Sequence, residues 1–354
     1  MAYTTIDDPG LFFNTVLYTG NGGSQTITGV GFQPDFVWFK TRDGTHAHAL
    51  VDSVRGTDKV MHSNTTQAEQ SISSQTFNSD GYALVADGTA NSINSSGSTK
   101  VAWNWKAGTS FTNDASGTGI GSVDSTGSIN TTAGISIMSW TSLASGSNYT
   151  IAHGLSATPA VIIMKGRHEA NSWIVYHHKN TAAPETDYLS LDTTAATADY
   201  HVWNDTAPTS SVFSLGTWSG LDDGGTMIAY CFAEKQGYSK FGSYTGNGST
   251  DGTFVYTGFK PAFVMIKRTD ATASWLMFDN KRVNPFNEIT ADLRPDSSQA
   301  EDTSTTYNTL DFLSNGFKLN QLNGDLNASG SNYIYMAFAE NPFVSSSGVP
   351  ACAR

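Results

Sequence analysis

One motif occurs three times in this chain of 354 residues, and it constrains the fold more than any other feature. Each copy has a glycine, a proline and then a short apolar run that ends in a lysine, with an arginine close behind. The copies span residues 31–42 (GFQPDFVWFKTR), 154–167 (GLSATPAVIIMKGR) and 258–268 (GFKPAFVMIKR). An apolar run this short, bounded by glycine and proline, is typical of a β-strand buried on both faces. We therefore expect three such strands in equivalent positions.

A second apolar segment follows each copy at a nearly constant distance. It occupies residues 101–106 (VAWNWK), 228–234 (IAYCFAE) and 334–340 (IYMAFAE). Two further matches join the outer copies, namely YTGNG at 18–22 and 244–248, and a Ser-Asp/Asn-Gly turn at 79–81 and 314–316. This order of landmarks predicts three diverged copies of one module, with boundaries at 1–108, 109–241 and 242–354.

The composition favours an all-β protein. Short strands alternate with turns rich in Gly and Asn, and segments rich in Leu, Lys and Glu are few. Aromatic residues make up 12% of the chain and are spread along it, which separates it from disordered sequences. We therefore predict three repeated antiparallel β-sandwich modules of jelly-roll or lectin-like type.

The segments between the modules differ in composition. Residues 109–133 are mostly Gly, Ser, Thr, Asn and Asp, which predicts a flexible linker that leaves module 1 freer than the others. The connection at 235–241 is short and should fix the second and third modules against each other. The leader, residues 1–15, contains the apolar run LFF at 11–13, which we expect to dock on the first module or on a neighbouring subunit.

Charge and hydropathy exclude several classes of partner. The formal net charge of −12 would repel phosphate backbones, so no nucleic-acid partner is expected. No apolar run reaches 18 residues, which predicts no membrane span. The N-terminus shows no secretory signal. Two cysteines, Cys231 and Cys352, do not make a disulfide framework.

The sequence offers no convincing catalytic or metal site. The obvious candidates are five of its eight histidines, at 46, 48, 177, 178 and 201, but they lack the spacing of a zinc protease, and no nucleophile elbow is present. We interpret them as exposed strand or loop residues. Glu234 and Glu340 occupy matched positions in different modules, so they do not form the facing pair that glycoside cleavage needs. We therefore predict no enzyme activity, no catalytic residues, no metal and no cofactor.

The repeated lysines Lys40, Lys165 and Lys267 end the motif in all three copies. Because every copy has the lysine, we interpret it as structural and not as part of a ligand site. Two roles are open for it: marking the exit of a buried strand into water, and pairing with an acid of the neighbouring strand.

Tryptophans beside polar turn residues suggest carbohydrate recognition. An indole ring can lie against a sugar ring while Asn and Asp side chains bind its hydroxyls. Trp38 and Trp275 lie in apolar runs and are predicted to be core residues. The surface candidates lie in loop-like sequence, and the predicted carbohydrate-binding residues are Trp203, Asn204, Asp205 and Trp218.

The three landmarks at 31–40, 79–82 and 101–106 together resemble a family of tailed-phage structural proteins that is frequent in marine phages and is described as concanavalin-like or lectin-like. The later copies extend the resemblance over nearly the whole chain, although residues 109–241 lack a clear Ser-Asp/Asn-Gly turn. The resemblance implies a virion component built of β-sandwich modules, assembled in the host cytoplasm, without an assigned reaction. It implies no catalytic residues.

These observations predict a phage virion structural protein, tail-fibre-like or spike-like, that contacts host surface glycan. One alternative is a capsid decoration or head-fibre protein without a ligand, and a second is a polysaccharide-degrading enzyme. The expected partners are other virion proteins and a host glycan. Repetition of a weak site suits avidity, so a homo-oligomer is expected, with a trimer as the guess by analogy.

Overall fold

The computed structural model describes residues 3–73, 75–86, 93–144, 146–218, 223–282, 287–306 and 308–350. In these residues nearly all regular structure is β-strand, and the pairings between named strands are antiparallel. The predicted fold class, all-β with antiparallel sheets, is confirmed. One short α-helix, α1 (Ala115–Thr118), and three 3₁₀ turns accompany the strands.

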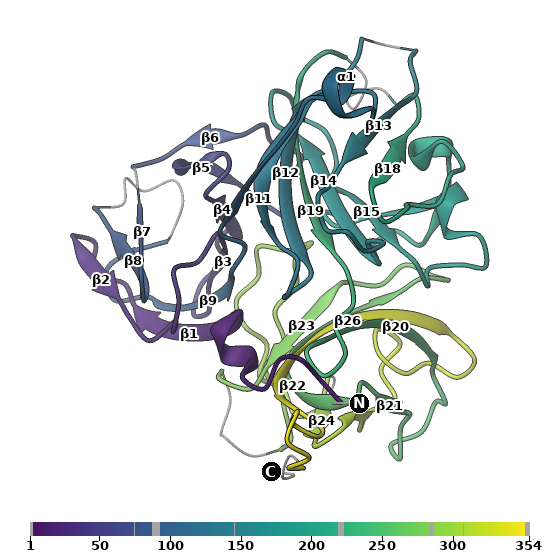
Figure 1. Ribbon diagram of the computed structural model, residues 1–354. Helices are drawn as coiled ribbons and strands as arrows, with labels where there is room; N and C mark the ends of the chain where they lie inside the picture. Colours follow the sequence, from purple (N-terminus) through teal and green to yellow (C-terminus); the bar gives the residue numbers. More distant parts are fainter. Residues whose placement is uncertain are drawn as a thin grey trace.

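Along the described chain the strands fall into three groups, each with one large and one small sheet, which we call modules 1, 2 and 3. Module 1 has a large sheet in the order β1 (Phe13–Thr19), β9 (Thr99–Trp105), β3 (Phe36–Thr41), β4 (Ala49–Asp52), β5 (Gly56–Met61) and β6 (Gln70–Ser71), and a small sheet in the order β2 (Gln25–Ile27), β8 (Gly81–Leu84) and β7 (Thr76–Asn78). Figure 1 shows this module at the left of the molecule.

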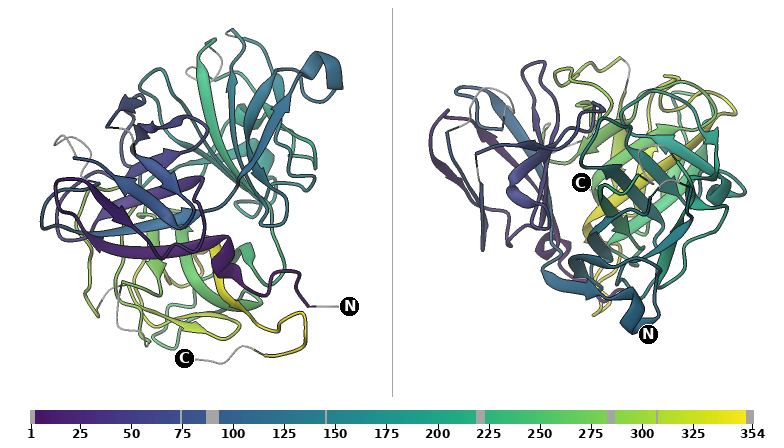
Figure 2. Two further views of the ribbon diagram at one scale, coloured as in Figure 1. Left: turned by 60° about the vertical axis from the view of Figure 1, so that its left-hand side comes forward. Right: turned by 90° about the horizontal axis from the view of Figure 1, so that it is seen from above.

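Module 2 has a large sheet in the order β10 (Thr109–Asn113), β11 (Ser125–Asn130), β12 (Ile135–Thr141), β19 (Thr226–Phe232), β14 (Val161–Gly166), β15 (Ile174–His177), β16 (Asp187–Ser190) and β17 (Ala198–Asp199), and a small sheet of β13 (Tyr149–Ala152) and β18 (Val212–Leu215). Module 3 has a large sheet in the order β20 (Ser239–Thr245), β26 (Asn332–Pro342), β22 (Phe259–Arg268) and β23 (Leu276–Asp279), and a small sheet in the order β21 (Phe254–Tyr256), β25 (Gly316–Leu319) and β24 (Leu310–Leu313). The three modules lie around a common centre (Figure 2).

The repeated motif forms the buried strand at the same place in each large sheet. It is β3 in module 1, β14 in module 2 and β22 in module 3, and each pairs with the strand of the second repeated segment, β9, β19 or β26. Every residue of β3 and β14 is buried, as is all of β22 except its last residue. The expectation that these strands are covered on both faces is confirmed.

The two faces of each motif strand pack against different cores. One set of alternate side chains faces the small sheet of its own module, and the other set joins a single apolar cluster shared by all three modules. The residues facing the module's own core are Val37 and Phe39, Ile162 and Met164, and Val264 and Ile266. The residues in the shared central core are Phe36 and Trp38, Val161 and Ile163, and Phe263 and Met265. Trp38 and Trp275 are core residues, as predicted.

The repeated lysines connect each module to the next. Lys40 Nζ donates to the carbonyl of Ser298 at 3.2 Å, Lys165 Nζ to that of Thr66 at 2.9 Å, and Lys267 Nζ to that of Thr194 at 3.3 Å. Module 3 thus covers the lysine of module 1, module 1 covers that of module 2, and module 2 covers that of module 3. Burial lowers the pKa of each lysine to about 8. The contacts run head to tail and close after three steps, as in a cyclic trimer.

Two of the three module interfaces contain a buried ion pair. At the interface of modules 1 and 2, Arg55 binds Asp52 at 2.5 Å, and the hydroxyl of Tyr230 donates to Asp52 at 2.7 Å. At the interface of modules 3 and 1, Arg282 binds Asp279 at 2.5 Å, and the indole of Trp103 donates to Asp279 at 2.9 Å.

Two further bridges cross the same interfaces. Glu69 of module 1 pairs with Arg167 of module 2, and Glu301 of module 3 pairs with Arg42 of module 1. The two interfaces therefore repeat the same set of four charged positions.

The interface between modules 2 and 3 is neutral at the same positions. His177, Asn180 and Thr197 stand where the other interfaces have Asp, Arg and Glu. His177 Nε2 contacts the carbonyl of Tyr335 at 3.1 Å, and Thr197 Oγ1 donates to Asn180 Oδ1 at 2.6 Å. The backbone N–H of Lys179 donates to His177 Nδ1, which assigns the proton to Nε2. Burial lowers the pKa of His177 to about 3, so this side chain is neutral.

Two sequence expectations about the connecting segments are wrong. Residues 109–133 are not a flexible linker, because β11 pairs with β12 and β10 pairs with β11, so both strands belong to the large sheet of module 2, with α1 in the connection between them. Module 1 is not freer than the others, because its side chains share the central core. The leader docks on more than the first module: Ile6 lies in the central core, and the ring of Phe12 packs edge-on against Tyr238 with centroids 6.0 Å apart.

We predict that Arg282→Ala lowers the free energy of unfolding by about 3–5 kcal/mol, because it leaves the buried carboxylate of Asp279 without its partner. The measurement is equilibrium unfolding in urea. The matched control is Lys318→Ala, which removes the partner of the exposed Asp251 and should leave the stability nearly unchanged, since water screens that pair. Equal losses in the two variants would contradict the role assigned to the buried pair.

Candidate functional site

The predicted carbohydrate-binding tryptophans have different environments. Trp203 ends the 3₁₀ turn η3 (His201–Trp203) and is fully buried in the core of module 2. Its indole donates to the carbonyl of Asp187 at 3.0 Å, and its ring packs edge-on against Tyr176 with centroids 5.4 Å apart. The expectation that Trp203 lies on the surface is wrong, because the turn directs this side chain inward.

Trp218 lies at the surface of module 2, half-buried, within a group of aromatic side chains. Its ring meets Tyr188 edge-on with centroids 4.7 Å apart and Tyr200 edge-on at 4.9 Å. Tyr200 stacks on His201 with centroids 4.2 Å apart, and 42% of Tyr200 is exposed. We call these four residues, Tyr188, Tyr200, His201 and Trp218, the aromatic cluster.

Regular structure positions the aromatic cluster. Tyr188 belongs to β16, and Tyr200 directly follows β17 at the outer end of the large sheet. The backbone N–H of Tyr200 donates to the carbonyl of Thr186 at 3.0 Å, and His201 Nε2 lies 3.1 Å from the hydroxyl of Thr217. The rings therefore sit on a hydrogen-bonded scaffold, which limits the entropy lost when a ligand binds.

The two polar residues predicted beside Trp203 form the turn after it. Asn204 and Asp205 both have a left-handed backbone, with φ of 52° and 45°. Asn204 Oδ1 accepts a hydrogen bond from the side-chain amide of Asn148 at 2.6 Å, so part of its side chain supports the turn. Asp205 is exposed. Of the four predicted residues, the structure thus places Trp218 in an aromatic surface group and buries Trp203.

Sequence reasoning missed the two tyrosines of this cluster. Tyr188 lies in the short segment DYLS, and Tyr200 stands next to His201 among acidic and small residues. The search for sugar-binding residues started from tryptophans beside polar turn residues, and neither tyrosine meets that criterion. Only the folded structure shows that both tyrosines lie at the edge of a sheet and contact the ring of Trp218.

The histidines interpreted as exposed differ in burial, and His46 and His178 are half-buried. His48 and His177 are buried at module interfaces, so that interpretation is wrong for both. His48 Nδ1 accepts from the indole of Trp38 at 2.9 Å, while its Nε2 contacts the carbonyl of Arg294 in module 3. His201 is exposed. Glu234 and Glu340 are half-buried and pair with Lys240 and Lys260, respectively.

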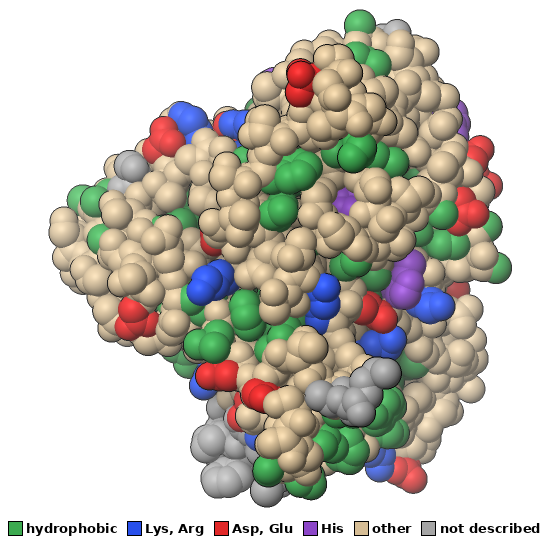
Figure 3. All heavy atoms as spheres, viewed as in Figure 1, with side chains coloured by type: hydrophobic (Ala, Val, Ile, Leu, Met, Phe, Trp, Pro, Cys, Tyr) green, Lys and Arg blue, Asp and Glu red, His purple; other side chains and the backbone are tan. Residues whose placement is uncertain are grey.

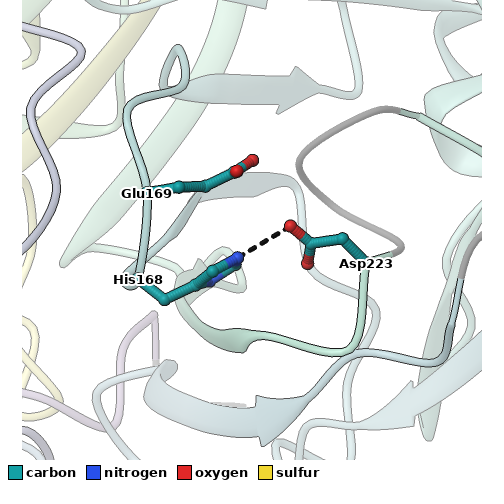
Figure 4. A group of neighbouring side chains, drawn as sticks. All are labelled: His168, Glu169 and Asp223. Carbon is teal, nitrogen blue, oxygen red and sulfur yellow. Dashed lines mark hydrogen bonds and ion pairs between the residues drawn. The ribbon is translucent and has the colours of Figure 1, made fainter.

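A second surface group combines His168, Glu169 and Asp223 (Figure 4). His168 and Glu169 follow β14, and Asp223 precedes β19 on the opposite loop. One ligand atom from each lies within 4.8 Å of the others, and His168 Nε2 is 2.7 Å from Asp223 Oδ2. Imidazole and carboxylate donors suit divalent transition metals, but all three residues are exposed. Sequence reasoning missed this group because Asp223 lies 55 residues after His168 in the chain.

The geometry around His168 depends on a glycine. A Cβ on Gly225 would lie 1.9 Å from Cε1 of His168, so only glycine lets the imidazole approach this backbone. Burial lowers the pKa of His168, but the hydrogen bond and negative charge of Asp223 outweigh that effect and raise the pKa above its usual value. Modules 1 and 3 have an aspartate here, Asp43 or Asp270, which accepts a backbone N–H of the neighbouring strand.

These observations define an all-β protein of paired antiparallel sheets with a surface aromatic cluster. The chain belongs to the family described as "Domain of unknown function (DUF7483)", whose model matches residues 8–342. No curated protein and no solved structure matches it. Within the described residues, none of the helices has the length and apolar character required to cross a membrane.

We predict that Asp223→Asn lowers the pKa of His168, because the substitution removes the negative charge that favours the imidazolium. In the wild type this interaction stabilises the folded protein at pH values below about 6.5, the pKa of His168 in the unfolded chain. The stabilisation is lost as the pH rises through the higher pKa that His168 has in the folded protein. NMR titration of the imidazole resonances measures the shift. Glu169→Gln is the control and should have a smaller effect. An unchanged His168 pKa in Asp223→Asn would contradict the assignment.

Proposed function

We propose that the protein is a structural component of a phage particle that contacts glycan on the host surface. The aromatic cluster of module 2 is the main support for glycan binding. Tyr200 and Trp218 offer ring surface at the edge of a sheet, beside the hydroxyl of Thr217 and the imidazole of His201. Aromatic faces next to hydrogen-bonding groups suit the apolar faces and hydroxyls of a sugar.

The charge of the chain narrows the class of glycan. A net charge of −12 makes long-range attraction of acidic polymers unfavourable. Near the aromatic cluster, β16 and β17 contribute Asp187 and Asp199, which pair across the two strands. Neutral or amino sugars are therefore the expected ligands.

The resemblance to tailed-phage structural proteins supports the particle assignment and, with it, assembly in the host cytoplasm alongside other virion proteins. A homo-oligomer would raise the avidity of a weak glycan site. The head-to-tail faces of the three modules already contact each other within one chain. An oligomer, including the trimer suggested by analogy, would therefore have to use other surfaces.

A capsid decoration or head-fibre protein without a ligand is the second candidate. The observation that favours it is the closed arrangement of three modules around one apolar core, which suits a rigid particle component. Locating the chain on labelled virions separates the candidates: a position on the tail agrees with host contact, and an even distribution over the capsid favours decoration.

A polysaccharide-degrading enzyme receives less support. Glu169 and Asp223 do place two carboxylates within 4.8 Å in one module, but Asp223 is bound to His168 and all three side chains are exposed. Glycoside hydrolysis needs a carboxylic acid and a carboxylate on either side of a bound sugar. We assign no catalytic residues, no cofactor and no metal, and propose that the protein is not an enzyme.

We predict that Trp218→Ala and Tyr200→Ala weaken binding to the preferred glycan at least tenfold. The ligand is first identified on a glycan array with the purified chain, and affinities are then measured by calorimetry. Tyr256→Ala is the matched control, because Tyr256 is an exposed aromatic residue of module 3, with 53% of it accessible. Absence of binding to any array glycan and to host cells, or an equal loss in the control, would contradict the proposal.

A further inference from the structure

Module 2 contains a β-hairpin that the repeat does not require. The large sheets of modules 1 and 3 begin with β1 and β20, which pair with β9 and β26. The equivalent strand of module 2 is β12, and β10 and β11 extend the sheet beyond it. β10 pairs only with β11 among the described strands, so its other edge is free. The hairpin contributes little to the central core and is available for another role.

A groove of about 430 Å³ lies beside this hairpin, a volume within the range of about 300–1,000 Å³ typical of ligand sites. We call it the β10 groove. It is lined by Phe111, Thr112, Asn113, Thr118, Ile120, Ala152, Gly154, Ser156, Ser210 and Ser211. These residues come from β10, the end of α1 and the segment after it, the end of β13 and the loop that follows, and the turn before β18, and none of them is charged. In Figure 3 the surface over α1 and β13 shows few charged side chains.

Phe111 provides the aromatic surface of the groove, and a glycine holds it in place. A Cβ on Gly154 would lie 2.7 Å from the Phe111 ring, and Gly154 has a φ of +68°, which also favours glycine. The ring is half-buried, so one part packs on the protein and another part remains accessible. This arrangement suits stacking against a flat ligand.

Hydroxyl groups surround the ring with their hydrogen-bonding capacity unused. Within the described part of the chain, the side-chain hydroxyls of Thr112, Ser156, Ser210 and Ser211 have no hydrogen-bond partner. Asn113 and Thr118, in contrast, bind each other at 2.9 Å and support the wall. The groove thus combines one aromatic ring with four free hydroxyls.

A second hollow of about 330 Å³ shares the lining residues Phe111 and Thr112 with the first. It extends along β10 and β11 to Ser53 and Val54 of module 1. Its remaining lining residues, Gly108, Ser110, Thr126, Gly127 and Ser128, are again uncharged. Strand β10 thus lines two hollows, and a polymer can contact more of this strand than a single small molecule can.

We propose that the β10 groove binds an uncharged polysaccharide chain, with Phe111 against one sugar ring and the hydroxyls of Thr112, Ser156 and Ser210 bound to sugar hydroxyls. A neutral polymer avoids transferring unpaired charges into a surface that offers no counter-charge. The site is separate from the aromatic cluster, and its binding does not depend on the phage assignment.

An extended peptide is the competing occupant, because the free edge of β10 offers backbone donors and acceptors. Strand addition draws its specificity from pockets for alternate side chains. Half of the residues that line the groove are instead Ser or Thr, with short hydroxyl side chains. This composition favours a sugar polymer, and peptide binding becomes an outcome of the experiment.

The test uses the full chain and measures binding by affinity electrophoresis in gels that contain a neutral β-glucan, a neutral α-glucan, a mannan or a galactan, with alginate as the acidic polymer. We expect retardation by at least one neutral polymer and none by alginate. Phe111→Ala and Thr112→Glu should each weaken binding at least tenfold. Thr112 is exposed, so its variant should fold even if the Phe111 variant does not.

Tyr256→Ala is the matched control, because Tyr256 is an exposed aromatic residue of module 3 outside both sites, and it should leave binding of the neutral polymer unchanged. Trp218→Ala is measured beside it to show whether the aromatic cluster, and not the β10 groove, causes the retardation. If only Trp218→Ala loses binding, the β10 groove is not the binding site, whereas the proposed glycan contact through the aromatic cluster stands. The inference is also overturned if no neutral polymer binds, if alginate binds better, if Phe111→Ala and Thr112→Glu keep wild-type affinity, or if extended peptides compete for the groove.

Discussion

Burial of both faces of the three large sheets is the constraint on which the rest of the structure depends. A sheet covered on one side only by its small partner would expose Phe36, Trp38 and their equivalents to water. Packing the three modules around one centre removes these rings from water together, and each aromatic side chain adds a large apolar area to the core. The stacked pair of Phe36 and Tyr230, with centroids 4.2 Å apart, joins modules 1 and 2 directly.

The polar contacts around this core determine which module meets which. Each repeated lysine reaches a loop carbonyl of another module, and two interfaces add an ion pair with a Tyr or Trp donor. Buried charges of this kind discriminate between correct and incorrect pairings more than they add stability. The third interface has His177, Asn180 and Thr197 instead, so the modules are no longer interchangeable. The functional surfaces proposed above also belong to the module that has departed furthest from the repeat.

Much of the architecture could be predicted from the sequence, because apolar strands bounded by Gly and Pro leave a strong pattern. The motif strands, their pairing partners and the all-β class follow from it. Residues 109–133 could not be predicted in the same way, since β10 and β11 lie at the edge of a sheet where polar Ser and Thr are tolerated. The candidate site was harder still. Trp203 has polar neighbours in sequence yet points inward, while Tyr200 joins Trp218 only through the fold.

The three modules share one core and should therefore fold as one unit. Differential scanning calorimetry of the full chain tests it most directly, by comparing the calorimetric enthalpy of unfolding with the van't Hoff enthalpy of the same transition. We expect a single transition in which the two enthalpies agree. Two or three separable transitions, each with the enthalpy of a domain of about 100 residues, would contradict it.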